Sequence, residues 1–145
     1  SKRLLVPAVL GLLFLAPAPA AAQSYAVQVW DQLQEHWKTI SKNDDDWYLQ
    51  NYVMGRIKNN GTDSWTFFFD KSKSYIITGA CDNDCKNVDL VLKDEDGDVI
   101  DKDRKDDDTP VLTLAPPKSG RYTIQVEMAE CKEEPCYFGI GIFLK

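Results

Sequence analysis

Apolar residues recur along this chain with two different periods, and the change of period divides it into a helical part and a sheet-forming part. Between residues 25 and 40 they repeat every three or four positions, which is typical of an amphipathic helix. Ser24 directly precedes this stripe and is a suitable N-cap. The stripe consists of Ala26, Val29, Trp30, Leu33, Trp37 and Ile40. A polar linker, residues 42–46, follows the predicted helix.

From residue 47 onward apolar and polar residues alternate, as they do in strands with one buried face. Turn signals such as Asn60-Gly61 and Asp96-Gly97 separate the runs. The predicted strands are 52–57, 65–70, 75–78, 88–93, 111–114, 121–128 and 137–144. No helical crossover lies between them, so the pattern predicts an all-β, antiparallel, jelly-roll-like β-sandwich of about seven or eight strands behind one helix.

Charge is concentrated in one segment of the chain. The formal net charge is -6, and residues 82–108 alone hold twelve acidic and five basic residues. An acidic protein repels phosphate backbones, which argues against nucleic-acid binding. Within this segment the run DKDRKDDD, residues 101–108, is predicted to be an extended, solvated loop because its charges repel one another.

The first 22 residues have the order of a secretory signal peptide. Lys2 and Arg3 precede an apolar run, residues 4–15, and an Ala/Pro-rich stretch follows up to residue 22. The apolar run is shorter than the roughly 20 residues of a membrane-spanning helix, so we expect no membrane span after signal cleavage. Residues 23–46 then form the helix and linker, residues 47–145 form the sandwich, and the destination is the periplasm or the medium.

Four cysteines occur as two close pairs, Cys81 with Cys85 and Cys131 with Cys136. Disulfides form and persist outside the cytoplasm, and three pairings of four cysteines exist. We favour the two local pairings. The rival interpretation, a four-cysteine zinc site, is disfavoured because neither spacing is the usual C-x2-C.

Candidate catalytic groups are few. His36 is the one histidine, and it lies at the edge of the apolar stripe of the helix, where a structural role is expected. Cysteines in disulfides are not nucleophiles, and no phosphate-binding glycine loop is present. We therefore expect a non-enzyme, with a carboxylate-based hydrolase as a remote alternative.

Several ordered motifs resemble the bacterial pre-peptidase C-terminal domain, a secreted β-sandwich that accompanies exported enzymes. The motifs are Asp63-Ser64-Trp65-Thr66-Phe67, Tyr75-Ile76-Ile77, Asp89-Leu90-Val91-Leu92, Pro117-Lys118-Ser119-Gly120 and the closing segment 137–144. The resemblance covers about residues 52–145 and implies a β-sandwich with an accessory role. Asn87 stands where the family has its first aspartate, and the cysteine pairs and the helix are additions.

The acidic segment raises the question of calcium, which takes six to eight oxygen ligands. The candidate ligands are Asp82, Asp84, Asp89, Asp94, Asp96 and Asp98. The spacing around Gly97 is not that of an EF-hand loop, so the alternative is a hairpin turn at Asp96-Gly97 with solvated charges around it.

Exposed aromatic residues are the candidate contact surface. Trp47, Tyr48 and Tyr52 cluster before the first predicted strand and could stack on sugar rings or contact a protein. We expect an exported, non-catalytic protein that binds an extracytoplasmic protein or polysaccharide. The alternative is a subunit of a surface assembly that associates with itself or others through a strand edge or a docking helix. The docking residues of that helix would be Trp30, Leu33 and Trp37.

Overall fold

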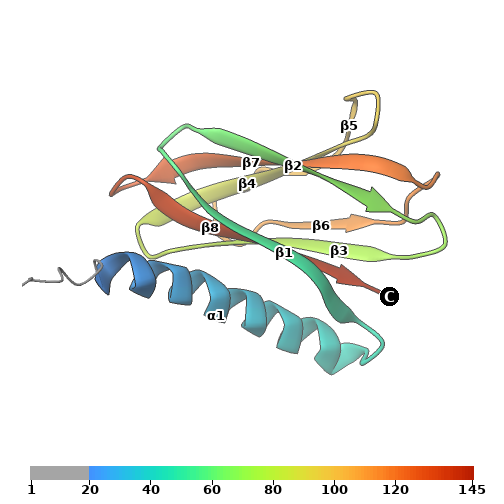
Figure 1. The fold of residues 1–145 in the computed structure, drawn as a ribbon, viewed down its shortest axis with the longest axis horizontal. Coiled ribbons are helices and arrows are strands. Elements are labelled where there is room, and N and C mark those ends of the chain that lie inside the picture. Colours follow the sequence, from blue (N-terminus) through green and yellow to red (C-terminus); the bar gives the residue numbers. More distant parts are fainter. Residues whose placement is uncertain (1–19) are drawn as a thin grey trace, which may run out of the picture.

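One helix precedes eight strands in the computed structural model, which describes residues 20–145 and side chains from Ser24 onward (Figure 1). The helix α1 spans Ala20–Asn43. The strands are β1 (Tyr48–Ile57), β2 (Thr62–Phe69), β3 (Tyr75–Cys81), β4 (Cys85–Lys93), β5 (Val99–Asp103), β6 (Val111–Leu114), β7 (Gly120–Cys131) and β8 (Cys136–Leu144). The predicted signal segment, residues 1–22, lies largely outside the described residues.

The strands form two antiparallel four-stranded sheets that face each other. One sheet has the order β1-β8-β3-β6 and the other the order β2-β7-β4-β5. Only β4 and β5 follow each other in the chain and also pair in one sheet. This arrangement is that of a jelly roll. The predicted fold class, an antiparallel jelly-roll-like sandwich behind one helix, is therefore confirmed.

The sandwich core consists of the inward-facing residues of both sheets. Along β7 the buried positions alternate with less buried ones, as predicted, and the buried members are Tyr122, Ile124, Val126 and Met128. Opposite them, Ile140 and Ile142 of β8 belong to the same cluster. Trp65 of β2 packs against Phe138 with 5.4 Å between ring centroids, so aromatic contacts close one side of this core.

Helix α1 lies on the outer face of the sheet that contains β8 (Figure 1). Val29 and Leu33 are completely buried there. A Cβ atom on Gly139 would come within 2.7 Å of Val29 Cγ1, and one on Gly141 within 3.3 Å of Leu33 Cδ2. The two glycines of β8 thus create the room in which the helix packs against the sheet.

The structure corrects three local predictions. Ser24 lies inside α1, so it is not the N-cap. The first strand begins at Tyr48, four residues earlier than expected. The charged run 101–108 is not wholly a solvated loop, because β5 extends to Asp103 and the side chain of Asp103 is buried. Pairing with the central strand β4 outweighs the low strand propensity of these charged residues.

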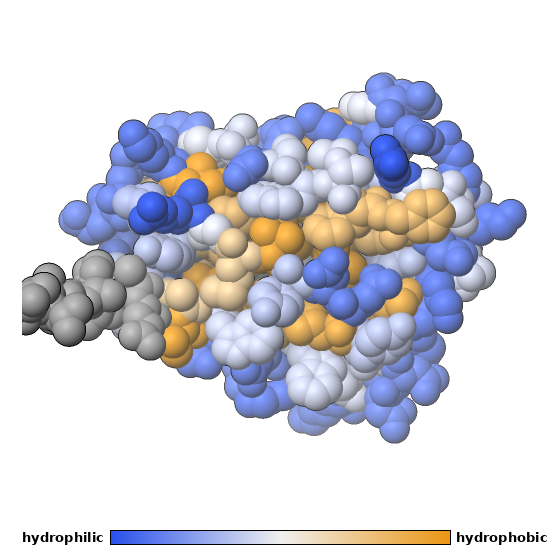
Figure 2. Space-filling model, viewed as in Figure 1, coloured by the Kyte–Doolittle hydropathy of each residue, from blue (hydrophilic) through white to orange (hydrophobic). Residues whose placement is uncertain are grey.

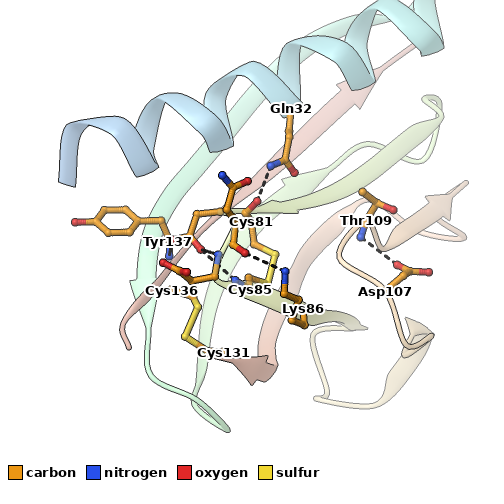
Figure 3. The surroundings of a disulfide bond; sticks show 12 residues. Gln32, Cys81, Cys85, Lys86, Asp107, Thr109, Cys131, Cys136 and Tyr137 are labelled. Carbon is orange, nitrogen blue, oxygen red and sulfur yellow. Dashed lines mark hydrogen bonds between the residues drawn. A yellow bond between two sulfur atoms is a disulfide. The ribbon is translucent and has the colours of Figure 1, made fainter. Parts of the chain in front are cut away.

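Both local cysteine pairs are disulfides (Figure 3). Each joins the end of one strand to the start of the next, and the register of β4 and β7 places Cys85 opposite Cys131. Gln32 Nε2 of α1 donates a hydrogen bond of 2.5 Å to the carbonyl oxygen of Cys81. The disulfides therefore fasten one end of the sandwich, and the helix is attached there too.

Residues 20–145 include no helix with an apolar stretch long enough to span a membrane.

Candidate ligand-binding site

A hollow lined mainly by aromatic residues lies where α1 meets the beginning of β1. We call it the aromatic groove; its volume is about 390 Å³, and its lining residues are Trp30, Gln34, Trp37, Tyr48 and Leu49. Residues 30, 34 and 37 share one face of the helix because they are separated by one or two turns. The groove thus combines one face of the helix with one edge strand of the sandwich.

A bulge in β1 sets the second wall of the groove. The pairing with β8 shifts between Leu49 and Asn51, so Leu49 lies opposite Phe143 and Tyr52 lies opposite Gly141. Since Gly141 faces Leu33 of the helix, Leu49 and Tyr52 both point toward α1. Strict alternation would have placed them on opposite faces, so the bulge brings them to one surface.

The aromatic side chains of this region are partly open to solvent. Trp37 is 44% exposed, Tyr48 51% and Tyr52 49%. The ring of Tyr52 packs on Trp30 with 4.9 Å between the centroids, which holds Trp30 in place beside the groove. In Figure 2 pale, ring-bearing side chains gather over α1 and the beginning of β1, next to an apolar strip in the middle of the face. Such exposed aromatic surface is typical of a binding site.

The structure divides the predicted aromatic trio. Tyr48 lines the groove and Tyr52 flanks it, but Trp47 lines a separate shallow hollow with Tyr75 and Ile76 of β3. The three predicted docking residues of the helix also lie in different environments. Trp30 and Trp37 line the groove, whereas Leu33 is completely buried against the protein's own sheet.

Gln34 and Leu49 belong to the groove but were not predicted from the sequence. Gln34 follows Trp30 by four residues and precedes Trp37 by three, so helical spacing alone could have placed it between the two tryptophans. No sequence pattern indicated that Leu49 faces the helix, because the bulge that turns it toward α1 depends on the pairing of β1 with β8.

The six predicted calcium ligands are dispersed over the structure. The Asp82 carboxylate accepts hydrogen bonds from the backbone N–H groups of Asp84, Cys85 and Tyr137, at 2.7 to 3.2 Å. Asp94 accepts from the backbone N–H groups of Asp96 and Asp98 in the β4–β5 turn, where Gly97 has a φ of 87°. Asp82 and Asp94 thus act in turns of the backbone, and calcium binding by the six residues stays a prediction that this arrangement does not favour.

Three other acidic residues, in the connection between α1 and β1, do have carboxylates close to one another. Within residues 20–145, Asp44, Asp45 and Asp46 are the group found to have carboxylate oxygens within 4.8 Å of one another. The Lys145 side chain forms an ion pair with Asp44, and its hydrogen bond lowers the pKa of that carboxyl below the usual value. The trio forms the connection between α1 and β1, so it lies in the chain next to Tyr48 of the aromatic groove.

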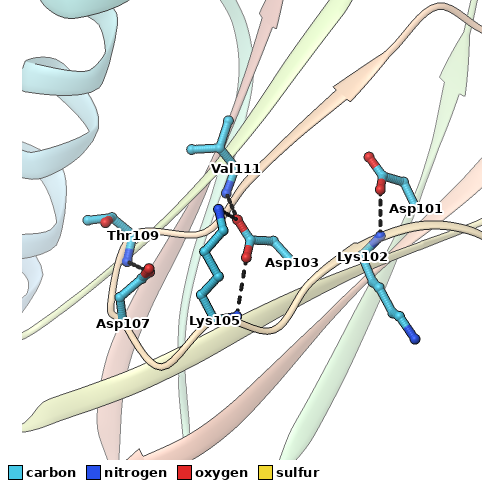
Figure 4. A network of polar contacts seen from close by, with 7 residues as sticks. All are labelled: Asp101, Lys102, Asp103, Lys105, Asp107, Thr109 and Val111. Atoms are coloured by element: carbon cyan, nitrogen blue, oxygen red, sulfur yellow. Dashed lines mark hydrogen bonds and ion pairs between the residues drawn. The ribbon is translucent and has the colours of Figure 1, made fainter.

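Asp103 is the buried centre of the polar network in Figure 4. Its carboxylate accepts hydrogen bonds from the backbone N–H groups of Lys105 and Val111, at 3.3 and 3.0 Å, and pairs with Lys105 Nζ at 3.2 Å. Burial alone would raise the pKa of Asp103, but these contacts outweigh it and lower the pKa below its usual value. Asp103 therefore ties β5 to the start of β6, across the gap between the sheets, and its role is structural.

Asp89 of β4 lies on the outer face of the β2-β7-β4-β5 sheet and is only 7% exposed. It is opposite Glu127 of β7, which receives a bidentate pair of hydrogen bonds from Arg104 at 2.8 and 2.9 Å. Asp89 Oδ1 is buried without a hydrogen-bond partner. Burial raises the pKa of the Asp89 carboxyl, Glu127 raises it further, and Arg104 opposes the rise.

His36 has the structural place expected from the sequence. Its Nδ1 lies 3.0 Å from Thr78 Oγ1 of β3, so the ring links α1 to the sheet. Burial lowers the pKa of His36, which keeps the imidazole neutral at neutral pH. The surrounding hollow is lined by three aliphatic residues, Ile40, Ile76 and Val111, and by three threonines, and its lining includes no carboxylate or cysteine.

Comparisons with known proteins find only distant structural similarity. No protein-family model and no curated protein matches the chain. Among solved structures, PliG of Aeromonas hydrophila, a periplasmic inhibitor of g-type lysozyme, is 15% identical over 66% of this chain and 83% of its own, with a TM-score of 0.47. The pre-peptidase C-terminal domain of a Bacillus anthracis collagenase is 15% identical over 65% of this chain and 89% of its own, also with a TM-score of 0.47. The similarity to both concerns the β-sandwich fold alone.

Proposed function

We propose that this protein is a non-catalytic binding protein that acts outside the cytoplasm and holds its ligand in the aromatic groove. The observation that carries the proposal is the convergence of Trp30 and Trp37 of α1 with Tyr48 of β1 around one hollow. Aromatic rings on rigid elements lose little conformational entropy when they bind, so they are efficient contact residues.

Two features support the extracytoplasmic and non-catalytic parts of the proposal. All four cysteines are in disulfides, which persist in oxidising compartments and leave no thiol for chemistry there. His36, the single histidine, is engaged with Thr78 on the far side of α1 from the groove. The polar groups of the groove are the Gln34 amide, the Tyr48 hydroxyl and the indole N–H groups, which can orient a ligand, and its lining includes no carboxylate, imidazole or thiol.

The experiment is a capture assay with three immobilised proteins: the wild type, Trp37→Ala, and Phe68→Ala as the control. Phe68 is 65% exposed and lies on β2, in the sheet that does not contain β1. Its replacement therefore removes an exposed aromatic ring that is not part of the groove. The beads are incubated with envelope and extracellular material of the producing cells, and retained sugars and peptides are quantified. We expect the wild type and Phe68→Ala to retain the same material, and Trp37→Ala to retain about a tenth of it.

Equal retention by all three proteins, or no retention by the wild type, would contradict a binding role for the groove. Circular dichroism of each variant checks that the sandwich is intact. Trp37 is nearly half exposed, so its replacement should not unfold the protein.

A further inference from the structure

The lining of the aromatic groove carries no charge. Its residues are three aromatics, one amide and one leucine. A charged group that entered the groove would lose hydration without meeting an opposite charge, which is unfavourable. The lining is therefore complementary to a neutral ligand that has both apolar faces and hydrogen-bonding groups.

The tryptophan spacing fits a chain of rings better than a compact ligand. Trp30 and Trp37 are seven residues apart on one helix face. Two helical turns correspond to about 10.5 Å along the axis, close to the length of two linked sugar rings in an extended polysaccharide. Gln34 lies between the tryptophans and supplies an amide donor and acceptor to hydroxyl groups. Successive disaccharide units could thus stack on the two indole rings.

The surroundings of the groove disfavour an anionic ligand. Asp31 is exposed next to Trp30 in the helix, and the carboxylates of Asp44, Asp45 and Asp46 lie within 4.8 Å of one another ahead of Tyr48. Lys145 pairs with Asp44, and Lys42 is the basic residue of the last helical turn, so they compensate part of this charge. The negative end of the helix dipole adds to the potential that an approaching anion would meet.

We infer that the aromatic groove binds a neutral, extended, β-linked polysaccharide, whose sugar rings stack on Trp30 and Trp37. This inference rests on the proposed binding function of the groove and names its ligand class. Acidic polysaccharides are disfavoured by the acidic residues that lie next to the lining residues in the chain, and single sugars bind weakly because they reach only one indole ring.

Isothermal titration of the full chain against defined sugars tests the inference. The neutral probes are the hexasaccharides of cellulose and chitin with their disaccharides, and the anionic probe is the hexasaccharide of polygalacturonate, each up to about 1 mM. We expect at least one neutral hexasaccharide to bind about ten-fold more tightly than its disaccharide and than the anionic probe. Trp37→Ala should weaken that binding about ten-fold, whereas Phe68→Ala should leave it unchanged.

Three outcomes would overturn the inference: no heat with either neutral hexasaccharide, tighter binding of the anionic probe, or equal binding by Trp37→Ala. These results remain distinguishable from failure of the proposed function, because the capture assay reports a groove-dependent ligand of any chemistry. Retention of peptides that depends on Trp37 would keep the binding function and reject the polysaccharide.

Discussion

Asp89 is a buried residue with a carboxylate oxygen that has no hydrogen-bond partner. Its Oδ1 atom and Asn87 Oδ1 are both buried without a hydrogen-bond donor, and both belong to β4. A buried acceptor without a partner costs free energy, and an ionised one costs more. Arg104 next to Asp89 compensates its charge only in part, since Arg104 is paired with Glu127 and burial together with Glu127 still raises the pKa of Asp89.

Asp89→Asn should therefore stabilise the protein at neutral pH, by on the order of 1 kcal/mol, because an amide is neutral and its N–H groups can donate to nearby oxygens. A carboxyl with a raised folded-state pKa is protonated more readily in the folded than in the unfolded protein. The wild type therefore loses stability as the pH rises through that pKa, while Asp89→Asn does not.

Urea unfolding of both proteins at several pH values measures this difference. The gap in the free energy of unfolding should be largest at pH 7 and should shrink in acid, where Asp89 is protonated in the wild type. Asp96→Asn, in the exposed turn between β4 and β5, serves as the control and should change stability little. A less stable Asp89→Asn at pH 7 would show that the ionised carboxylate is needed.

At the level of elements, the position of α1 depends on two glycines of β8, which have no side chain to separate the helix from the sheet. Val29 and Leu33 enter the space above Gly139 and Gly141, so the helix approaches the sheet more closely than it could over larger residues. Gln32 adds a hydrogen bond to Cys81, and His36 one to Thr78. The same docking determines where Trp30 and Trp37 lie relative to β1.

Gly139→Ala should destabilise the docking of α1 by about 1–3 kcal/mol, because the new Cβ would lie 2.7 Å from Val29 Cγ1 and 3.0 Å from Leu33 Cδ1. Gly120→Ala is the matched control, since its Cβ would meet its nearest neighbour, Glu95 Oε2, at an ordinary 3.7 Å. Hydrogen exchange of the α1 amides should accelerate in Gly139→Ala and not in Gly120→Ala. If the α1 amides of Gly139→Ala exchanged no faster than those of the wild type, the prediction would be wrong, because the helix would then accommodate the added methyl group without losing stability.

For the molecule as a whole, the disulfides and the proposed binding site are located in different regions. The disulfides join β3 to β4 and β7 to β8 at the end of the sandwich where Cys85 lies opposite Cys131. The aromatic groove instead involves α1 and the beginning of β1. Its lining includes no cysteine, so the two regions can be changed independently.

Replacement of Cys81 and Cys85 together by serine should lower the free energy of unfolding by about 2 kcal/mol, because it removes a short closed loop from the unfolded chain. The Cys131/Cys136 double replacement should have a similar effect, since its loop is of nearly equal length. Chemical denaturation measures both. Capture by the groove should be unchanged below the unfolding transition, and loss of capture in a folded variant would contradict the separation of the two regions.

Strands whose pattern repeats with period two were predictable, and β6 (Val111–Leu114) has the predicted bounds. The β5 strand was missed because three of its five residues are charged and because it forms by pairing with β4. For the candidate site, Tyr48 and Tyr52 were predicted as exposed aromatics, and Trp30 and Trp37 as docking residues of the helix. Their grouping was not predictable, because it depends on the bulge in β1 and on the glycines of β8.

The helix, most strands, the turn at Asp96-Gly97 and the local disulfides could be predicted from sequence, since they follow from periodicity, backbone freedom and short chain separation. The folded arrangement was needed to show which aromatic residues share a surface and which aspartates are buried. Those properties depend on contacts between residues that are distant in the chain, such as Trp30 with Tyr52 and Asp89 with Glu127. Local patterns report which face of an element is apolar, but not what that face meets.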